Sequence, residues 1–436
     1  MNTLWKKSGT KTHIAVNKYI ISENCYGDMI LLPYDVTASI AHARMLCKVG
    51  LLTKNELKML MHGLKEIADL HKKSRFHLKQ SDEDCHTAIE NYLVKKCGDA
   101  GKKIHIGRSR NDQVLVALRL FSRQQLLEIK KVLLEAAEEI LSFAKKNEFI
   151  PMPGYTHTQQ AMPSSVGQWA GNFVEALLDD CGVLEAAYIL NDQNPLGSAA
   201  GFGTGLPLDR NFTTQLLGFS KTQINTLYCQ NSRGKIESFI LSGLVQVMLT
   251  LGKIANDLVW FTSKEFNFFA VDNSLTTGSS IMPQKKNLDI MEVLRANVSV
   301  IFSYQMQIQT VSHNLISGYN KDLKITKQTL INSFKIVMES LEMVSLIFKH
   351  LKPNPQKLLQ SFSPEIFATD VVNILVQKGV PFRDAYQHVG KELGEIKLPD
   401  IVDNIKSKKH LGATGNLALN YYLKSIKRMK RKKWSG

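Results

Sequence analysis

The stretch QVLVALRLFSRQQLLEIKKVLLEAAEEILSFAK, residues 113–145, decides the fold of this 436-residue chain. It contains neither glycine nor proline, so nothing in it interrupts a helix. Its apolar residues recur mostly three, four or five positions apart and form one apolar stripe. They are Val114, Leu118, Phe121, Leu126, Ile129, Leu133, Ala137, Ile140 and Leu141. A helix of this length spans roughly 50 Å and needs partners along its whole length.

Four further stretches repeat the helical pattern, namely residues 164–189, 236–264, 289–312 and 323–351. Residues 236–264 are apolar on nearly every side, which predicts a helix that is buried all round. Convincing alternating strand segments are few, so the sequence predicts an all-α fold with a central bundle of long helices. Helices longer than the usual globular length also favour oligomerisation.

Breaks in the pattern predict a chain of three parts. Residues 1–107 form an N-terminal helical part, residues 108–355 the central bundle, and residues 356–436 a small C-terminal helical part with a basic tail. Prolines and glycine at 151–154 interrupt the chain after the first long helix, and prolines at 352–355 end the bundle.

The loop NPLGSAAGFGTG, residues 194–205, is rich in glycine. It lacks the Lys-Ser/Thr pair of a phosphate-binding P-loop, and no predicted strand precedes it. We therefore expect a structural loop and not a nucleotide site.

The charge of the chain favours anionic partners. Lys and Arg number 55 against 39 Asp and Glu, which gives a formal net charge of +16. Such a field suits carboxylate or phosphate substrates, nucleic acid or acidic membranes. Part of the charge lies in the tail KSIKRMKRKKW, residues 424–434, which is typical of a nucleic-acid or surface-binding segment or of a solvated, partly frayed end. We favour the frayed end.

The sequence predicts a cytoplasmic protein without a resident metal or cofactor. Its six cysteines form no C-x-x-C pair and are expected to be reduced. Neither an H-E-x-x-H motif nor a Cys/His cluster is present in the sequence. No apolar run follows the first residues. The most apolar segment, residues 239–259, is interrupted by polar residues that argue against a membrane span, among them Ser242, Gln246, Lys253, Asn256 and Asp257.

Polar chemistry gathers in the loop GSSIMPQKKN, residues 278–287. A Gly-Ser loop exposes backbone N–H donors, while lysine and asparagine add donors that could hold an oxyanion or a carboxylate. Three more polar clusters lie between apolar helices, at residues 105–112, 154–159 and 319–327. Each alone is typical of a capped helix end. Together they predict a cationic pocket, which suits a di- or tricarboxylate substrate.

These segments carry a resemblance to a known family. The 278–287 loop resembles the signature of the fumarase/aspartase superfamily, and its QKKN ending resembles that of the argininosuccinate lyases. Further similarities, in the expected order, cover most of the chain. They are DEDCH (82–86), GRSRNDQ (107–113), GYTH (154–157), PLGS (195–198), LDR (208–210), YNKD (319–322) and GVPFR (379–383).

The resemblance implies a reaction and an assembly. The family splits argininosuccinate reversibly into arginine and fumarate without a cofactor, in a homotetramer whose four sites are each assembled from three chains. It also implies that Ser279 takes the proton and that Lys285 and Asn287 bind the carboxylate that accumulates charge. His157 is implied as the acid partner or as a charge-stabilising group, with Glu292 as the carboxylate that pairs with it.

The resemblance further implies substrate contacts from Asn111, Thr156, Tyr319 and Lys327, with Arg110 and Arg210 as carboxylate forks. The chain departs from the family pattern in several places. Lys324 stands where the family has glutamine, and its added ammonium would tighten a carboxylate or disturb the arginine half. Leu288 stands where proline is usual, and segments 5–9 and 22–28 also differ from the usual motifs.

Three alternatives stay open at this point. One is another enzyme of the superfamily, such as adenylosuccinate lyase, fumarase or aspartase, which the RSRND cluster and the double lysine disfavour. A second is a catalytically weak structural relative, which the presence of Ser279, His157, Lys285 and Asn287 disfavours. A third is a nucleic-acid-binding protein that uses the basic tail, although the sequence has no aromatic-interleaved groove or helix-turn-helix pattern.

Overall fold

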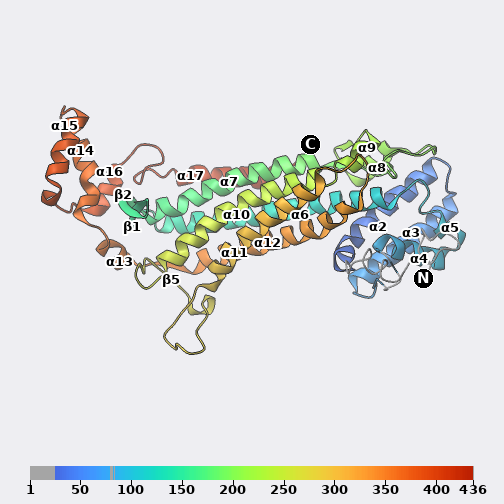
Figure 1. Ribbon diagram of the computed structural model, residues 1–436, viewed down its shortest axis with the longest axis horizontal. Helices are drawn as coiled ribbons and strands as arrows, with labels where there is room; N and C mark the ends of the chain where they lie inside the picture. The colour runs from blue at the N-terminus through green and yellow to red at the C-terminus, as the bar shows by residue number, and fades with distance from the viewer. Residues whose placement is uncertain (1–24, 79–81, 83, 436) are drawn as a thin grey trace.

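The computed structural model describes residues 25–78, 82 and 84–435. The chain is an elongated helical rod with an N-terminal group of helices at one end and a small C-terminal group at the other (Figure 1). The departures at residues 5–9 and 22–24 lie outside the described residues. The predicted all-α fold is confirmed.

Five long helices form the rod. They are α6 (Arg110–Lys146), α7 (Val166–Asn191), α10 (Lys235–Phe261), α11 (Asp289–Ser312) and α12 (Ile325–His350). Each matches a stretch predicted from apolar periodicity, with ends within a few residues of the prediction. The 37-residue α6 begins at a capping box, in which Ser109 and Asp112 satisfy each other's backbone N–H groups. The polar 105–112 cluster therefore both starts a helix and, as described below, borders a cavity.

Helix α10 is only partly buried, which corrects the expectation of burial all round. Ile240, Leu244 and Leu251 on its inner face are fully buried in the main core. On its outer face, Leu249 is 41% exposed and Trp260 is 57% exposed. The segment Thr226–Phe261 is long and apolar enough to cross a membrane, yet 61% of its most apolar window is buried inside the protein. A single chain thus leaves one apolar face of its central helix uncovered.

The N-terminal helices have a core of their own and also pack on the rod through α2. The helices are α2 (Cys25–Lys48), α3 (Lys54–Lys72), α4 (Cys85–Cys97) and α5 (Asp99–Lys102). Two short helices, α8 (Arg210–Leu217) and α9 (Thr226–Asn231), follow the glycine-rich loop.

Strands are few and short among the described residues. They pair as β1 (Pro151–Thr156) with β2 (Gln159–Ser165), β3 (Gln193–Asn194) with β4 (Lys221–Thr222), and β5 (Phe269–Val271) with β6 (Leu351–Pro353). The first and third pairs are antiparallel and the second is parallel. The β1–β2 hairpin was not predicted, because its prolines and its His-Thr turn carry none of the usual hairpin signals.

The C-terminal part contains α13 (Pro355–Gln360), α14 (Ala368–Gln377), α15 (Phe382–Lys391), α16 (Ile401–Ser407) and α17 (Leu419–Arg431). Four 3₁₀ turns complete the described elements: η1 (Asn273–Leu275), η2 (Lys321–Lys324), η3 (Pro364–Phe367) and η4 (Leu393–Glu395).

The basic tail is an ordered helix and not a frayed end. Helix α17 returns to the rod and lies along α6 and α7 (Figure 1). Lys130 donates a 2.6 Å hydrogen bond to the carbonyl of Lys432, and Trp434 is buried against Tyr188. Lys430 forms a 2.6 Å ion pair with Glu138. The expectation of a frayed tail was wrong because its apolar residues and these pairs hold it on the bundle.

Candidate active site

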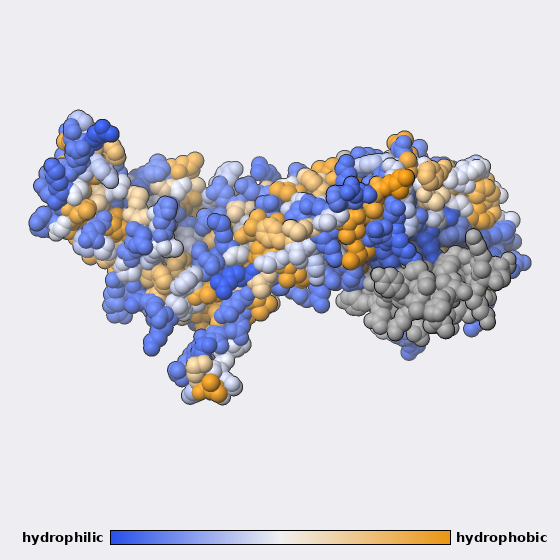
Figure 2. All heavy atoms as spheres, in the orientation of Figure 1, coloured by the Kyte–Doolittle hydropathy of each residue, from blue (hydrophilic) through white to orange (hydrophobic). Residues whose placement is uncertain are grey.

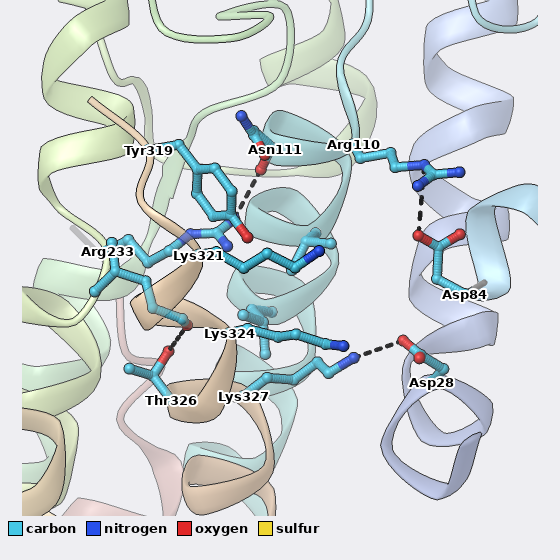
Figure 3. A pocket seen from close by; sticks show the side chains of 13 residues that line it. Asp28, Asp84, Arg110, Asn111, Arg233, Tyr319, Lys321, Lys324, Thr326 and Lys327 are labelled. Atoms are coloured by element: carbon cyan, nitrogen blue, oxygen red, sulfur yellow. Dashed lines mark hydrogen bonds and ion pairs between the residues drawn. The ribbon is translucent and has the colours of Figure 1, made fainter. Parts of the chain in front are cut away.

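A cavity of about 370 Å³ lies where the first turn of α6 faces α2, α4 and the start of α12. Asp28 and Asp84 line the cavity wall formed by the N-terminal helices, and Arg110 and Asn111 line it from α6. Tyr319, Lys321, Lys324 and Lys327 enter from η2, α12 and the segment before them, as Figure 3 shows. Five of the predicted site residues therefore meet in one place: Arg110, Asn111, Tyr319, Lys324 and Lys327.

Two ion pairs cross this cavity and join the N-terminal helices to the rod. Lys327 Nζ lies 2.7 Å from Asp28 Oδ1, and both residues are buried. Arg110 Nε lies 3.5 Å from Asp84 Oδ2, and its Nη2 donates a 2.9 Å hydrogen bond to the Thr87 hydroxyl. Burial opposes ionisation of Asp84, but His86 and Arg110 outweigh it and lower the pKa of that carboxyl. The Asp84 carboxyl is therefore kept ionised, and each of the two carboxylates contacts a cation.

Arg233, which sequence reasoning missed, organises the far wall of the cavity. It is buried, donates a 2.9 Å hydrogen bond to the carbonyl of Asn111, and places its guanidinium 5.0 Å from the centre of the Tyr319 ring. It thus fixes two predicted substrate contacts relative to each other (Figure 3). Its sequence setting, a short polar run before α10, gives no local signal of this role.

The glycine-rich loop is docked on the carboxylate of Asp112. Oδ2 of that residue accepts hydrogen bonds from the backbone N–H groups of Gly197 at 2.9 Å and Ala199 at 3.1 Å. Burial raises the pKa of Asp112 to about 6, although these hydrogen bonds favour the ionised form. The contacts support the structural interpretation of the 194–205 loop.

Arg210 does not meet the other predicted substrate contacts. Its guanidinium donates to four main-chain carbonyls, those of Leu196 at 3.1 Å, Ile224 at 3.0 Å, Gln223 at 2.7 Å and Asn194 at 3.5 Å. Those donors are the ones that a carboxylate fork would use. The structure therefore gives Arg210 a structural role in the loop, in place of the predicted carboxylate contact.

Thr156 and His157 lie at the exposed tip of the β1–β2 hairpin. His157 and Thr158 form its two-residue turn and have φ values of 52° and 62°. Positive φ at two consecutive residues other than glycine is unfavourable, and such strain is concentrated at functional sites. His157 forms no hydrogen bond to Glu292 within the described chain, and both side chains are exposed. Their predicted pairing is therefore not formed within the described residues of one chain.

The 278–287 segment is a loop that projects from the rod between β5 and α11 (Figure 1). Its neck is closed by two backbone hydrogen bonds between Thr277 and Asn287, of 3.0 and 2.9 Å. Ser279 Oγ accepts hydrogen bonds from the N–H groups of Ile281 and Met282. Lys285 is exposed at the end of the loop.

Helix length keeps these groups apart within one chain. Asn111 is in the first turn of α6, whereas the hairpin follows its last residue, about 55 Å away for a helix of 37 residues. Asn287 and Tyr319 lie at opposite ends of α11, which spans about 36 Å with its 24 residues. The first turn of α6, which lines the cavity, thus lies near one end of the rod, while the hairpin and the loop lie toward the other (Figure 1).

One buried group within the described residues has donor atoms close enough for a metal ion, namely Asp35, Cys85 and His86. Nδ1 of His86 already forms a 2.7 Å contact with Asp35 Oδ2, and it is also the ring nitrogen nearest the Cys85 sulfur. The carboxylate of Asp35 outweighs the effect of burial and raises the pKa of His86. Asp35 and His86 are therefore a hydrogen-bonded pair of the protein core, with Cys85 beside them.

Comparison with known proteins supports the family that the sequence motifs indicate. A lyase family model matches residues 12–303, and a model of the argininosuccinate lyase C-terminal region matches residues 365–396. The argininosuccinate lyase of Thermotoga neapolitana is 42% identical over 90% of this chain and 99% of its own length. That of Sorangium cellulosum is 40% identical over 98% of this chain and 99% of its own length. The chain belongs to the argininosuccinate lyase family. It is therefore a carbon–nitrogen lyase that acts on argininosuccinate.

Solved structures of more distant proteins share the fold. An EDDS lyase in complex with formate has a TM-score of 0.76 at 22% identity and covers 92% of this chain and 87% of its own. The fumarate lyase:delta crystallin of Brucella melitensis has a TM-score of 0.74 at 18% identity, over 95% of this chain and 94% of its own. At these identities the similarity establishes the helical fold of the chain and not its substrate.

Proposed function

We propose that this enzyme eliminates fumarate from argininosuccinate with residues drawn from the cavity, the hairpin and the projecting loop. One observation carries the proposal. The predicted catalytic side chains, Ser279, His157, Lys285 and Glu292, lie on exposed or partly exposed segments, whereas Asn111, Tyr319 and Lys327 line a cationic cavity. Such an arrangement supplies reacting groups and a binding pocket without a resident metal or cofactor.

The proposed chemistry starts with loss of a proton from the carbon next to a succinate carboxylate. Ser279 takes this proton, because serine becomes a useful base where nearby positive charge stabilises its alkoxide. Lys285, Asn287 and Thr156 hold the carboxylate that gathers the negative charge. The electron pair then forms the fumarate double bond as the C–N bond breaks, and the guanidino nitrogen leaves with its bonding pair. His157, paired with Glu292 of another chain, supplies the proton or stabilises the charge.

We propose that the enzyme is a homotetramer with sites assembled from three chains. Apolar side chains gather over the middle of the rod and at the tip of the loop in Figure 2. Exposed examples on α10 and α11 are Phe239 at 39%, Val293 at 58% and Met306 at 68%. Burying these faces against antiparallel copies would bring the hairpin and loop of neighbouring chains to the cavity. The exposed apolar side chains of α10 and α11 would then be buried in the core of the tetramer.

The experiment that tests this function is direct. Purified protein is mixed with argininosuccinate, and fumarate release is followed by its ultraviolet absorbance. Adenylosuccinate, malate and aspartate are run in parallel at equal concentration. We expect argininosuccinate to have the highest kcat/KM, and faster conversion of another substrate would contradict the proposed specificity. We also propose a cytoplasmic location, which fractionation of the source cells would check.

A further inference from the structure

The basic C-terminal segment uses its cations in two ways. Lys430 forms a 2.6 Å ion pair with Glu138. Lys432 forms a 2.7 Å ion pair with Glu185, so both lysines hold helix α17 on the bundle. Four more cations of α17 are exposed, and none of their side chains has a hydrogen bond or an ion pair with any residue that the structure describes. They are Lys424, Lys427, Arg428 and Arg431, and together we name them the cationic strip.

The cationic strip lies on one face of α17. Its members follow one another at steps of three, one and three residues, and this spacing places their side chains on the same side of an α-helix. From the first to the last, the strip extends roughly 10 Å along the helix axis. The opposite face packs into the main core through Leu419 and Ile426. Because this packing fixes the helix, the four charges are held together in one compact array.

A comparison with helix α3 shows how concentrated this charge is. Exposed lysines of α3 are Lys54, Lys58, Lys65 and Lys72. They extend over all 19 residues of that helix, roughly 27 Å, and the exposed carboxylate of Asp69 lies among them. Helix α17 contains no acidic residue at all. A dense array of like charges attracts a polyanion more strongly than the same charges dispersed among carboxylates.

The setting of α17 favours nucleic acid over a membrane as the polyanion. Helices that bind at a membrane surface bury an apolar face among the lipids, but the apolar face of α17 is already packed in the core. A nucleic-acid duplex needs charge alone, and it carries one phosphate charge per about 1.7 Å, or about six along the length of the strip. The apolar faces proposed for the tetramer lie on α10 and α11, whereas α17 packs on α6 and α7 (Figure 1), so that assembly does not use the strip.

We propose that the cationic strip is a binding surface for the phosphate backbone of a nucleic-acid duplex. It is separate from the lyase reaction, because none of its residues lines the cavity or belongs to the hairpin or the projecting loop. Contacts to phosphates position a protein on a duplex but carry no sequence information. The binding is therefore independent of base sequence, and it weakens steeply as salt rises.

The test measures binding of the whole enzyme to a fluorescent DNA duplex of mixed sequence by anisotropy. With four phosphates neutralised, the affinity should fall about 100-fold between about 50 and 200 mM salt. Duplexes rich in A·T and in G·C should bind equally within about twofold. A variant in which all four strip residues are changed to glutamine should bind at least about tenfold more weakly at about 50 mM salt and lose most of the salt dependence. Lys424→Arg with Lys427→Arg keeps the charge and should bind like the wild type.

The four exposed lysines of α3 provide the matched control. Changing all four to glutamine removes the same charge elsewhere on the protein and should weaken duplex binding by less than about twofold. Both fourfold variants should release fumarate from argininosuccinate at the wild-type rate, which shows that they are folded.

Four results would overturn the inference. The first is no duplex binding by the wild type at about 50 mM salt. The second is wild-type affinity in the strip variant, and the third is equal weakening by the strip and α3 variants, which would assign the binding to net charge. The last is binding to phosphatidylglycerol vesicles without binding to the duplex, which would assign the strip to a membrane.

Discussion

The cavity and the projecting loop are built in opposite ways. Around the cavity, polar side chains are held by partners from distant parts of the same chain, as in the buried Asp28–Lys327 pair. In the loop, Ser279 bonds only to backbone groups two and three residues further on, and Lys285 is exposed. One chain therefore holds the cavity in place by its own contacts but leaves Ser279 and Lys285 of the loop without such distant partners among the described residues.

This difference has a physical reason. A binding pocket that discriminates among ligands needs fixed charges, and fixed charges are held by burial and ion pairs. Reacting groups that must approach a substrate bound on another chain have to lie outside the chain's own core. The difference predicts that substitutions in the loop change activity alone, whereas substitutions at the cavity also change stability.

The largest expected effect is on turnover in the loop. Ser279→Ala should lower kcat by about three orders of magnitude, as expected for loss of a catalytic base. The free energy of unfolding should change by no more than about 0.5 kcal/mol, because the side chain packs against no core residue. Fumarate release and thermal denaturation measure the two quantities. Ser274→Ala, at the exposed neck of the same loop, is the control and should retain full turnover. Wild-type-like turnover of Ser279→Ala would reject the assigned base.

The second prediction tests whether different chains share a site. Inactive His157→Ala and inactive Ser279→Ala subunits, mixed and reassembled, should recover about one quarter of wild-type activity, because random mixing gives that share of sites with neither change. The assembly should elute near four times 49.0 kDa. A monodisperse active monomer, or no recovery after verified subunit exchange, would show that each chain builds its own site.

The third prediction concerns the cavity. Asp28→Asn leaves the buried Lys327 ammonium without its carboxylate, so the free energy of unfolding should fall by about 3 kcal/mol and activity should fall with it. Denaturant unfolding and fumarate release give both values. The exposed pair of Asp99 and Lys102 is the control, and Asp99→Asn should leave the free energy of unfolding nearly unchanged. An Asp28→Asn variant that is inactive but as stable as the wild type would contradict the prediction that cavity substitutions, unlike loop substitutions, also change stability.

The smallest expected effect is a pH dependence beside the cavity. Burial first, and then Arg108, lower the pKa of His105 from 6.5 to about 4. The unfolded chain therefore binds this proton more readily, and the stability that neutral His105 contributes is lost as pH falls from about 6.5 toward 4. His105→Gln should show a smaller loss of unfolding free energy between pH 7 and pH 5 than the wild type. His388→Gln, at an exposed histidine, is the control, and equal slopes for all three proteins would contradict the assignment.

Much of the fold was predictable because helical periodicity is local. The stripe in residues 113–145 predicted α6, and the stretch 289–312 predicted α11 with the same bounds. The β1–β2 hairpin was not predictable in this way, since it depends on His157 and Thr158 adopting an unfavourable backbone conformation. The packing of α17 was also missed, because a run of lysines gives no sign of the glutamates on other helices that receive it.

The sequence by itself determined the long helices, the polar segments between them and the family to which they belong. Only the tertiary structure decided which cations line the cavity and which hold a loop in place. Arg110 and Arg210 are both arginines at the first residue of a helix, yet one lines the cavity and the other donates to main-chain carbonyls. The reason is that helical periodicity depends on residues only three or four positions apart, so it can be read from the sequence. An ion pair such as Asp28 with Lys327 joins residues 299 positions apart, so only the folded chain shows it.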